Sequence, residues 1–244
     1  MSNVKLMLEY DGTDFNGWQL QPTGRTIQGE LSRALARIEG RDVTLHAAGR
    51  TDAGVHALGQ VVSVRLNSEL GATTLRDAIN ANVDRDVRVR NAEFVEDSFH
   101  ARVHAKRKSY RYQIWTGDAV SPFVRRYVHQ HRGRLDLDLM RDAGRFLIGT
   151  HDFRGFTVTS SEAETTVRTI ERVDVERRDE IVAVTVVANG FLRYMVRAIA
   201  GTLIEIGRGH LPAGSVNEVI ETGDRSRAGP TAPALGLTLM QVDY

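Results

Sequence analysis

The segment 48–60, AGRTDAGVHALGQ, places one acid, Asp52, between two glycines, Gly49 and Gly54. Because glycine lacks a Cβ, it lets a short loop take backbone conformations that other residues resist. Apolar residues alternate on both sides of the segment, which predicts a strand, a tight connection and a second strand. A carboxylate held between two strands could act as a nucleophile or as a base. The alternative is a plain turn, since Asp and Gly are common turn residues.

Positive charge is concentrated between residues 100 and 134. One acid, Asp118, stands there among nine basic residues: Arg102, Lys106, Arg107, Lys108, Arg111, Arg125, Arg126, Arg132 and Arg134. The segment therefore carries +8, whereas the whole chain carries +1 and the remainder −7. One basic segment in an otherwise acidic chain indicates a surface for a polyanion. A solvated run of charges is the alternative.

An aromatic residue, Tyr110, lies inside the basic segment, in the string KRKSYRY at 106–112. A ring can stack on a base while Lys and Arg side chains hold the phosphates, so this mixture suits single-stranded or flipped-out nucleotides. The alternative is a core tyrosine, because strands favour Tyr.

Two further cations, Arg193 and Arg197, lie in the segment 191–206, whose apolar residues recur at helical spacing. A helix over this segment would place the two arginines one turn apart, away from the apolar side. Ala200 and Gly201 share their side, and such small residues would let another surface come close to the arginines. Two solvated arginines are the alternative.

The composition excludes several classes of protein. Of the 244 residues 41% are hydrophobic and 26% charged, as in soluble globular proteins. We expect no membrane span and no signal peptide. The absence of cysteine excludes disulfides and thiolate catalysis and is compatible with the cytoplasm. No nucleotide-binding or serine-hydrolase motif occurs, and we expect no metal site, since His100 and His104 fall in a predicted strand end and loop.

The order of predicted elements repeats itself. In the first half we expect a strand at 4–9, a helix from the N-cap Thr26 to a stop at Gly40, strands flanking the 48–60 loop, a helix from about Thr74 and a strand at 87–94. In the second half we expect a strand at 110–114, a helix after Asp136, strands at 170–175 and 181–187, a helix at 191–206 and a strand at 235–242.

Both orders read β-α-β-β-α-β, the ferredoxin-like pattern. We therefore predict an α+β fold of two similar halves, 1–104 and 105–244, with mainly antiparallel sheets. Two such halves would meet at a central cleft, and clefts between domains usually bind ligands.

The string GRTDAGVHA at 49–57 resembles the signature of the tRNA pseudouridine synthase A family. Other strings that are similar to the family occur in its order: YDGTDFNGWQ (10–19), RTIQGEL (25–31), FHAR (99–102), YRY (110–112), LIGTHDFRGF (147–156), VRTI (167–170), NGFLRYMVRAIAGTLIEIGRG (189–209) and APALGL (232–237). Together they cover nearly the whole chain. The segment 157–166 matches the family least, and its role is left open.

The resemblance implies a cofactor-free isomerase that converts uridine to pseudouridine in the anticodon arm of tRNA, at positions 38, 39 and 40. It implies that Asp52 is the catalytic carboxylate with Arg50 beside it, that Tyr110 stacks on the target base, and that Arg197 pairs with Asp52. It also implies a cytoplasmic homodimer whose tRNA spans both subunits. The residues that we expect to contact the RNA are Arg25, Arg50, Lys106, Arg107, Tyr110, Arg111 and Arg193.

The chemistry suits these residue types. The base must leave the anomeric carbon, rotate and return through C5, with no redox change and no group donor, so no cofactor is expected. A paired arginine favours an ionised carboxylate, and the uridine must be flipped out of its stack. Whether Asp52 attacks C1′ or C6, or acts as a base on the sugar, is left open.

Two other functions are considered. A non-catalytic RNA-binding protein or RNA chaperone on the same fold would share the basic segment and Tyr110, but would not need Asp52 and Arg197 together. A small-molecule enzyme would leave the basic segment unexplained.

Overall fold

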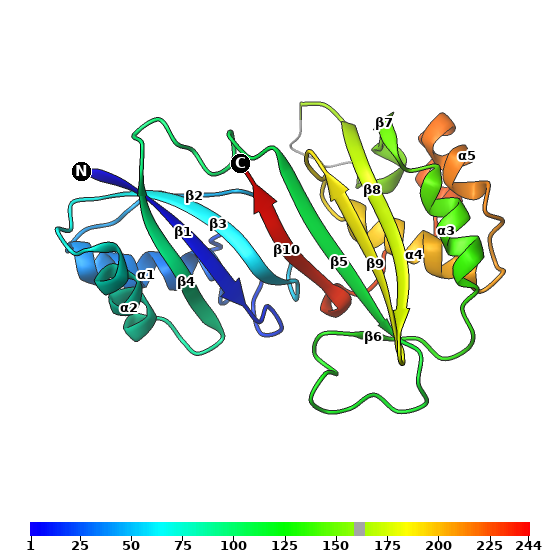
Figure 1. Ribbon diagram of the computed structural model, residues 1–244, viewed down its shortest axis with the longest axis horizontal. Coiled ribbons are helices and arrows are strands. Elements are labelled where there is room, and N and C mark those ends of the chain that lie inside the picture. The colour runs from blue at the N-terminus through cyan, green and yellow to red at the C-terminus, as the bar shows by residue number, and fades with distance from the viewer. Residues whose placement is uncertain (159–163) are drawn as a thin grey trace. The chain divides into compact units, whose positions relative to one another are not determined.

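The computed structural model describes residues 1–158 and 164–244 (Figure 1). The described chain forms two compact units, one of Met1–Lys106 with Leu239–Tyr244, the other of Arg107–Thr238. Both units combine helices with mainly antiparallel strands, so the predicted α+β class is confirmed. Part of the segment 157–166, whose role the sequence leaves open, lies outside the described residues.

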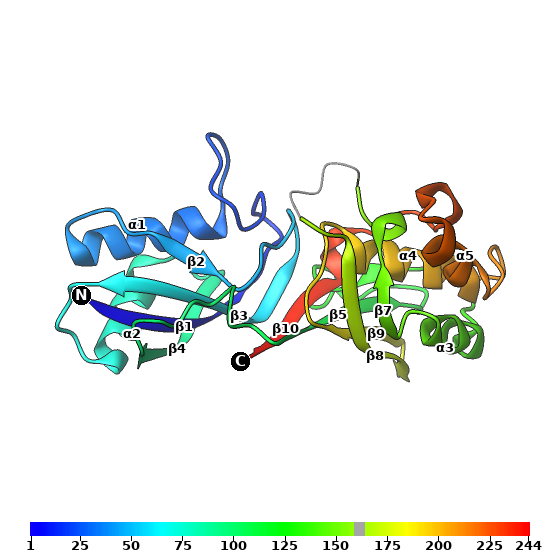
Figure 2. The same ribbon diagram turned by 90° about the horizontal axis from the view of Figure 1, so that it is seen from above.

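The first unit is built around its N-terminal strand. Its elements are β1 (Ser2–Tyr10), α1 (Ile27–Glu39), β2 (Leu45–Ala47), β3 (His56–Leu66), α2 (Ala72–Asn82), β4 (Val87–Val95) and the end of β10 (Leu237–Asp243). Strand β1 pairs antiparallel with β4 on one side and with β3 on the other, and β2 pairs antiparallel with β3. Figure 2 shows α1 along one face of this sheet.

The two ends of α1 and its apolar face follow from the sequence. Thr26 accepts a hydrogen bond from the Gly29 N–H, and Gly40 ends the helix with a left-handed φ of 68°, as predicted. Leu31 and Leu35 of the helix are fully buried, as are Leu6 and Leu8 of β1. Burial of these side chains is the main contribution to the stability of the unit.

The second unit is built on β5 and the strands that follow it. Its helices and strands are β5 (Arg107–Trp115), β6 (His129–Gln130), α3 (Leu137–Arg145), β7 (Gly149–Asp152), β8 (Val167–Arg178), β9 (Ile181–Ala188), α4 (Met195–Gly207) and α5 (Ser215–Thr222). The strand order is β5-β9-β8-β7 with antiparallel pairing, and β6 runs parallel to the end of β5. Helix α3 begins directly after Asp136, as predicted, and Asp136 is its N-cap.

Several elements differ from the prediction. Helix α4 begins at Met195 rather than near 191, because Tyr194 takes a left-handed φ of 61° and interrupts the helical path. The order of predicted elements lacks β7, whose last two residues are His151 and Asp152, and the adjoining Phe153 is buried. The short elements β6, β7 and α5 are too brief to give a clear periodic signal.

The last strand also departs from the predicted division. The prediction grouped residues 105–244 together, whereas the contacts of Leu239–Tyr244 lie with the first unit. Strand β10 neighbours β3, where the main chain of Met240 and Gln241 closely approaches Gly59. In the described part of the chain, no helix has the length and apolar character that crossing a membrane requires.

Helix α4 depends on a close approach at Gly201. A Cβ there would overlap the carbonyl oxygen of Pro230, so the segment 230–232 is the surface that the small residues of α4 admit. Next to it, Ala232 N–H donates to Arg197 O at 3.0 Å. This contact therefore sets where the segment lies relative to Arg197.

We expect Gly201→Ala to lower the free energy of unfolding by about 1–3 kcal/mol, because forced overpacking outweighs the gain of about 1 kcal/mol in helix propensity. Urea unfolding followed by circular dichroism measures the change. Gly71→Ala is the matched control, since a Cβ at Gly71 would meet nothing within 4 Å. Equal stability of the two variants would contradict the prediction.

Candidate active site

The loop that carries Asp52 joins β2 to β3 and is tied down at its base. Ala48 N–H donates to Val61 O at 2.8 Å, and Gln60 Nε2 donates to Gly49 O at 2.7 Å. At the tip, Val55 N–H donates to Asp52 O at 3.1 Å, closing a tight turn. Asp52 is partly exposed there, so the loop holds a carboxylate at a defined place within reach of a ligand.

A second loop, residues 10–18, supports the first. Trp18 N–H donates to Thr51 O at 3.0 Å, and Gly54 N–H donates to Phe15 O at 3.3 Å. Gly12 N–H donates to His56 Nδ1 at 3.0 Å. A Cβ on Gly12 would overlap the carbonyl group of Val55, so only glycine allows the two loops to lie this close. The strings at 10–19 and 49–57 are therefore two halves of one structure.

A buried polar cluster lies beneath the loops. The Tyr10 hydroxyl is 2.9 Å from Thr51 Oγ1 and accepts from Gln60 Nε2 at 3.3 Å. Burial raises the pKa of Tyr10 to about 12, although its hydrogen bonds to Thr51 and Gln60 act in the opposite direction. The hydroxyl is therefore protonated at neutral pH, and the cluster positions the loop rather than supplying a base.

Arg25, expected to contact RNA, is engaged within the protein. Its Nη1 is 2.5 Å from Asp86, its Nη2 2.7 Å from Asp84 and its Nε 2.9 Å from Glu30. The hydrogen bond to Asp86 is the main cause that raises the pKa of Arg25. The guanidinium also lies 4.1 Å from the centre of the Phe15 ring. Arg25 thus supports the loop that holds the Asp52 segment, and its contact with RNA stays a prediction.

Tyr110 belongs to an aromatic layer of the second unit. Its side chain meets Phe191 edge-on, with ring centroids 5.1 Å apart, and the residue is only 7% exposed. The neighbouring Tyr112 donates its hydroxyl hydrogen to Pro233 O at 2.9 Å. Burial raises the pKa of Tyr112, and the positive charge of Arg197 opposes that rise. The inward face of β5 thus lies close to Arg197.

Tyr194 brings the two predicted arginines together, although Arg193 precedes α4 and only Arg197 belongs to it. The guanidinium carbons of Arg193 and Arg197 lie 4.9 Å and 5.0 Å, respectively, from the centre of the Tyr194 ring. Arg193 Nη2 donates to the Tyr194 hydroxyl at 3.1 Å, and Arg197 Nε donates to Ala232 O at 2.8 Å. Sequence reasoning missed Tyr194, because nothing in NGFLRYMVR marks a left-handed residue.

The expected RNA-contacting residues at the start of β5 do not share one face. Alternation along the strand places Arg107 and Arg111 on the face opposite Tyr110, and Lys106 precedes the strand. Arg107 Nη1 is 3.4 Å from Glu171, and Arg111 Nε donates to Thr185 Oγ1 at 3.4 Å. The basic segment is therefore divided between two surfaces. Arg50 is exposed beside Asp52.

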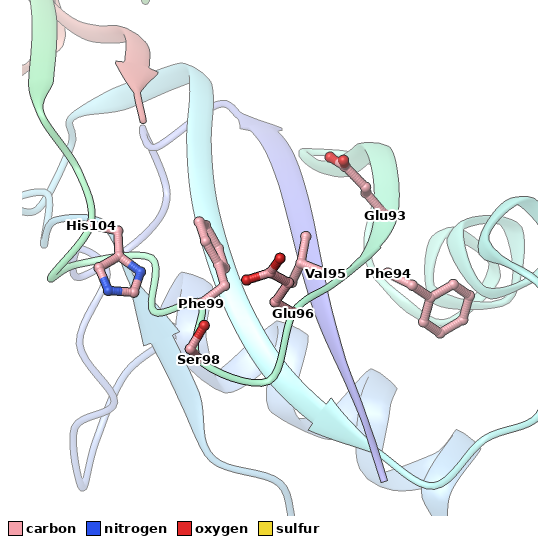
Figure 3. A pocket seen from close by; sticks show the side chains of 7 residues that line it. All are labelled: Glu93, Phe94, Val95, Glu96, Ser98, Phe99 and His104. Carbon is pink, nitrogen blue, oxygen red and sulfur yellow. The ribbon is translucent and has the colours of Figure 1, made fainter.

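The described residues contain no group of three His, Asp or Glu side chains that could hold a metal ion. A pocket of about 480 Å³ lies at the end of β4, and none of the predicted site residues lines it (Figure 3). Glu93 and Glu96 stand on its wall beside Phe99 and His104. Two carboxylates would repel a phosphate, so this pocket is not assigned to the RNA.

Comparison with known proteins gives a consistent result. The family model described as tRNA pseudouridine synthase matches residues 6–102 and 143–244, which include Asp52 and Arg197 but not Tyr110. The chain is 43% identical to tRNA pseudouridine synthase A of Acetivibrio thermocellus over the full length of both. It is 45% identical to the protein of that name from an Exiguobacterium species, with all of this chain and 98% of the relative covered.

The buried Tyr10 hydroxyl under the Asp52 loop should make the free energy of unfolding decrease at alkaline pH. The folded protein holds the Tyr10 proton more tightly than the unfolded chain does. The protonated hydroxyl therefore contributes fully to stability below pH 10, and this contribution is lost as the pH rises to about 12. Tyr10→Phe should cost about 0.5–1.5 kcal/mol at neutral pH, from the lost hydrogen bonds, and should lose less stability in that alkaline range.

Urea unfolding between neutral pH and about pH 12 measures both effects. Tyr127→Phe, in an exposed loop, is the control for loss of a hydroxyl. Parallel pH profiles for wild type and Tyr10→Phe would show that this hydroxyl is not held as described.

Proposed function

The chain belongs to the tRNA pseudouridine synthase family, and on that premise we propose that it converts uridine to pseudouridine in the anticodon arm of tRNA, at positions 38, 39 and 40. The observation that carries the proposal is the Asp52 loop, a partly exposed carboxylate on a loop fastened by its own strands and by the loop 10–18. Such a loop presents the acid at a defined place to a base that is flipped out of its stack.

Asp52 is the proposed catalytic carboxylate. The bond between C1′ and N1 of the uridine breaks, the base rotates, and a bond forms between C1′ and C5. The proton on C5 then leaves and N1 gains one, so the product is an isomer of the substrate. Attack of Asp52 on C1′, its addition to C6 and removal of a sugar proton all require the ionised carboxylate.

The remaining roles are proposed from the family resemblance and from local geometry. Arg197 is the proposed partner of Asp52, and its bond to Ala232 O fixes the plane of the guanidinium. Tyr110 is the proposed stacking residue, and its packing against Phe191 holds the ring in place while leaving little of it exposed. Arg50 and Arg193, both exposed, are proposed to contact the RNA.

The assembly and the location of the protein are proposals from the resemblance alone. We propose a homodimer whose tRNA spans both subunits, which sedimentation of the protein with and without tRNA would test. We also propose that it acts in the cytoplasm, where its substrate would be found.

Asp52→Asn tests the catalytic role. Asn keeps the size and turn preference of Asp but loses the charge, so pseudouridine formation should fall at least a hundredfold, by order of magnitude, while tRNA affinity is largely kept. Chemical labelling of pseudouridine in exposed tRNA measures the product, filter binding the affinity, and circular dichroism the fold. A folded variant that forms pseudouridine at the wild-type rate would show that Asp52 is not the catalytic carboxylate. A wild-type protein that binds tRNA but forms no pseudouridine would support the non-catalytic alternative, an RNA-binding protein or RNA chaperone.

A pair of variants tests the two arginines on Tyr194. Arg197→Met should reduce turnover more than tRNA binding, because the carboxylate would lose its proposed partner. Arg193→Met, beside the same ring, should act mainly on binding. Single-turnover rates and dissociation constants for tRNA separate the two effects. If both substitutions change turnover and tRNA binding equally and only mildly, the two arginines are solvated surface residues.

A further inference from the structure

The connection between β5 and β6, residues 116–128, is a long loop that is internally hydrogen-bonded; it is the green loop joining these strands in Figure 1. Val124 and Arg125 N–H groups both donate to Ser121 O, at 3.1 Å and 3.0 Å, and Tyr127 N–H donates to Val124 O at 2.8 Å. These bonds form a short run of turns. The β5–β6 loop therefore has a conformation of its own and can hold side chains in place.

Two glutamines fasten the base of the β5–β6 loop. Gln113 Nε2 donates to Tyr127 O at 3.2 Å, and Gln130 Nε2 donates to Asp118 O at 3.1 Å. One glutamine belongs to β5 and the other to β6, so both ends of the loop are tied to the strands that flank it. A surface carried by this loop is thus presented from a fixed base.

Phe123 stands at the turn of this loop and is 89% exposed. Its N–H donates to Ser121 Oγ at 3.3 Å, which holds the main chain while the ring points to solvent. A single exposed apolar residue is common in proteins and needs no explanation by itself. What distinguishes Phe123 is the charge around it.

Arginines surround the exposed ring in the sequence. The segment 116–134 contains Arg125, Arg126, Arg132 and Arg134, all exposed, against one acid, Asp118, for a net charge of +3. Within the described part of the chain, Arg125, Arg132 and Arg134 have no carboxylate at ion-pair distance. These three exposed arginines therefore give the segment a surplus of cations for an anionic partner.

We propose that the β5–β6 loop is a second RNA contact, in which Phe123 stacks on an unpaired base of the tRNA and Arg125 binds a phosphate of the same strand. Aromatic rings among arginines bind single-stranded RNA in this way. The inference rests on the proposed function, which supplies tRNA as the ligand. It adds a surface that lies in the segment 103–142, outside the ranges that the family model matches.

This contact is separate from the base that reacts. Tyr110 lies five residues before Trp115, where β5 ends, and a strand advances about 3.4 Å per residue, so the loop begins about 17 Å from Tyr110. If Tyr110 stacks on the target uridine, Phe123 reaches a different nucleotide. The loop would therefore contribute to affinity and to the choice of RNA rather than to the chemical step.

RNA fits the loop better than a second copy of the chain does. The centre of an interface between identical subunits is depleted of charged residues, whereas Phe123 has two arginines within three positions. Nucleic acid instead pairs cations with phosphates and offers flat bases to aromatic rings.

The test measures dissociation constants of Phe123 variants for an unmodified tRNA by filter binding at several salt concentrations. Phe123→Ala should weaken binding about tenfold, which lies within the range for one stacked base. Phe123→Leu should weaken it similarly, since Leu is apolar but cannot stack, and Phe123→Trp should bind as wild type or more tightly. Arg125→Gln should lower the slope of log K against log salt by about 0.7–0.9.

Phe146→Ala is the matched control, because Phe146 is 45% exposed at the end of α3, outside this loop, and its replacement should change nothing. Sedimentation of each variant reports the oligomeric state. A Phe123→Ala variant that binds tRNA with wild-type affinity overturns the inference. The inference is also overturned if the Phe123→Ala protein dissociates into subunits while the Phe123→Leu protein does not, because Phe123 would then belong to a protein interface.

The proposed function is judged separately, on the wild-type protein. If it neither binds tRNA nor makes pseudouridine, both proposals fail. If it does both while Phe123→Ala binds equally well, only the role of the β5–β6 loop fails.

Discussion

The close approach of the loops 10–18 and 48–56 is the contact on which the candidate site in the first unit depends. Backbone hydrogen bonds join the loops, and Gly12 allows them to lie at a distance that any side chain would prevent. Beneath the loops, the Gln60 amide donates a hydrogen bond to the buried Tyr10 hydroxyl, at a place where an unpaired polar group would cost free energy. The exposed tip of the loop, with Asp52, can therefore be rigid although it belongs to no helix or strand.

A different constraint organises the second unit. Tyr194 takes a backbone conformation that L-residues rarely adopt, and this ends the chain's extended path and begins α4. The same residue offers its ring to the guanidinium groups of Arg193 and Arg197. Close packing of α4 against the segment 230–232 then places a carbonyl acceptor at Arg197. One strained residue and one glycine contact thus position the cations that the sequence marks as functional.

Charge in the basic segment has two different uses. Arg107 has a nearby carboxylate on the sheet, as Arg25 has in the first unit, and such pairs support the protein's own structure. Arg125 in the β5–β6 loop lacks such a partner among the described residues, and it stands beside an exposed ring. The sequence shows how many basic residues a segment contains. Only the structure shows which of them are paired with carboxylates of the protein itself and which can bind a polyanion.

The sequence by itself determined the class of fold, most of the longer elements and the importance of the Asp52 loop. Capping residues such as Thr26 and Asp136, apolar periodicity and turn glycines are local signals, so they can be read without knowing the fold. Only the tertiary structure decided that Arg25 is held by three carboxylates and that Tyr194 interrupts the helix predicted at 191–206. It also decided that the last residues, Leu239–Tyr244, join the first unit. These outcomes depend on pairings between residues far apart in the chain, and their energies exceed the local preferences that a sequence displays.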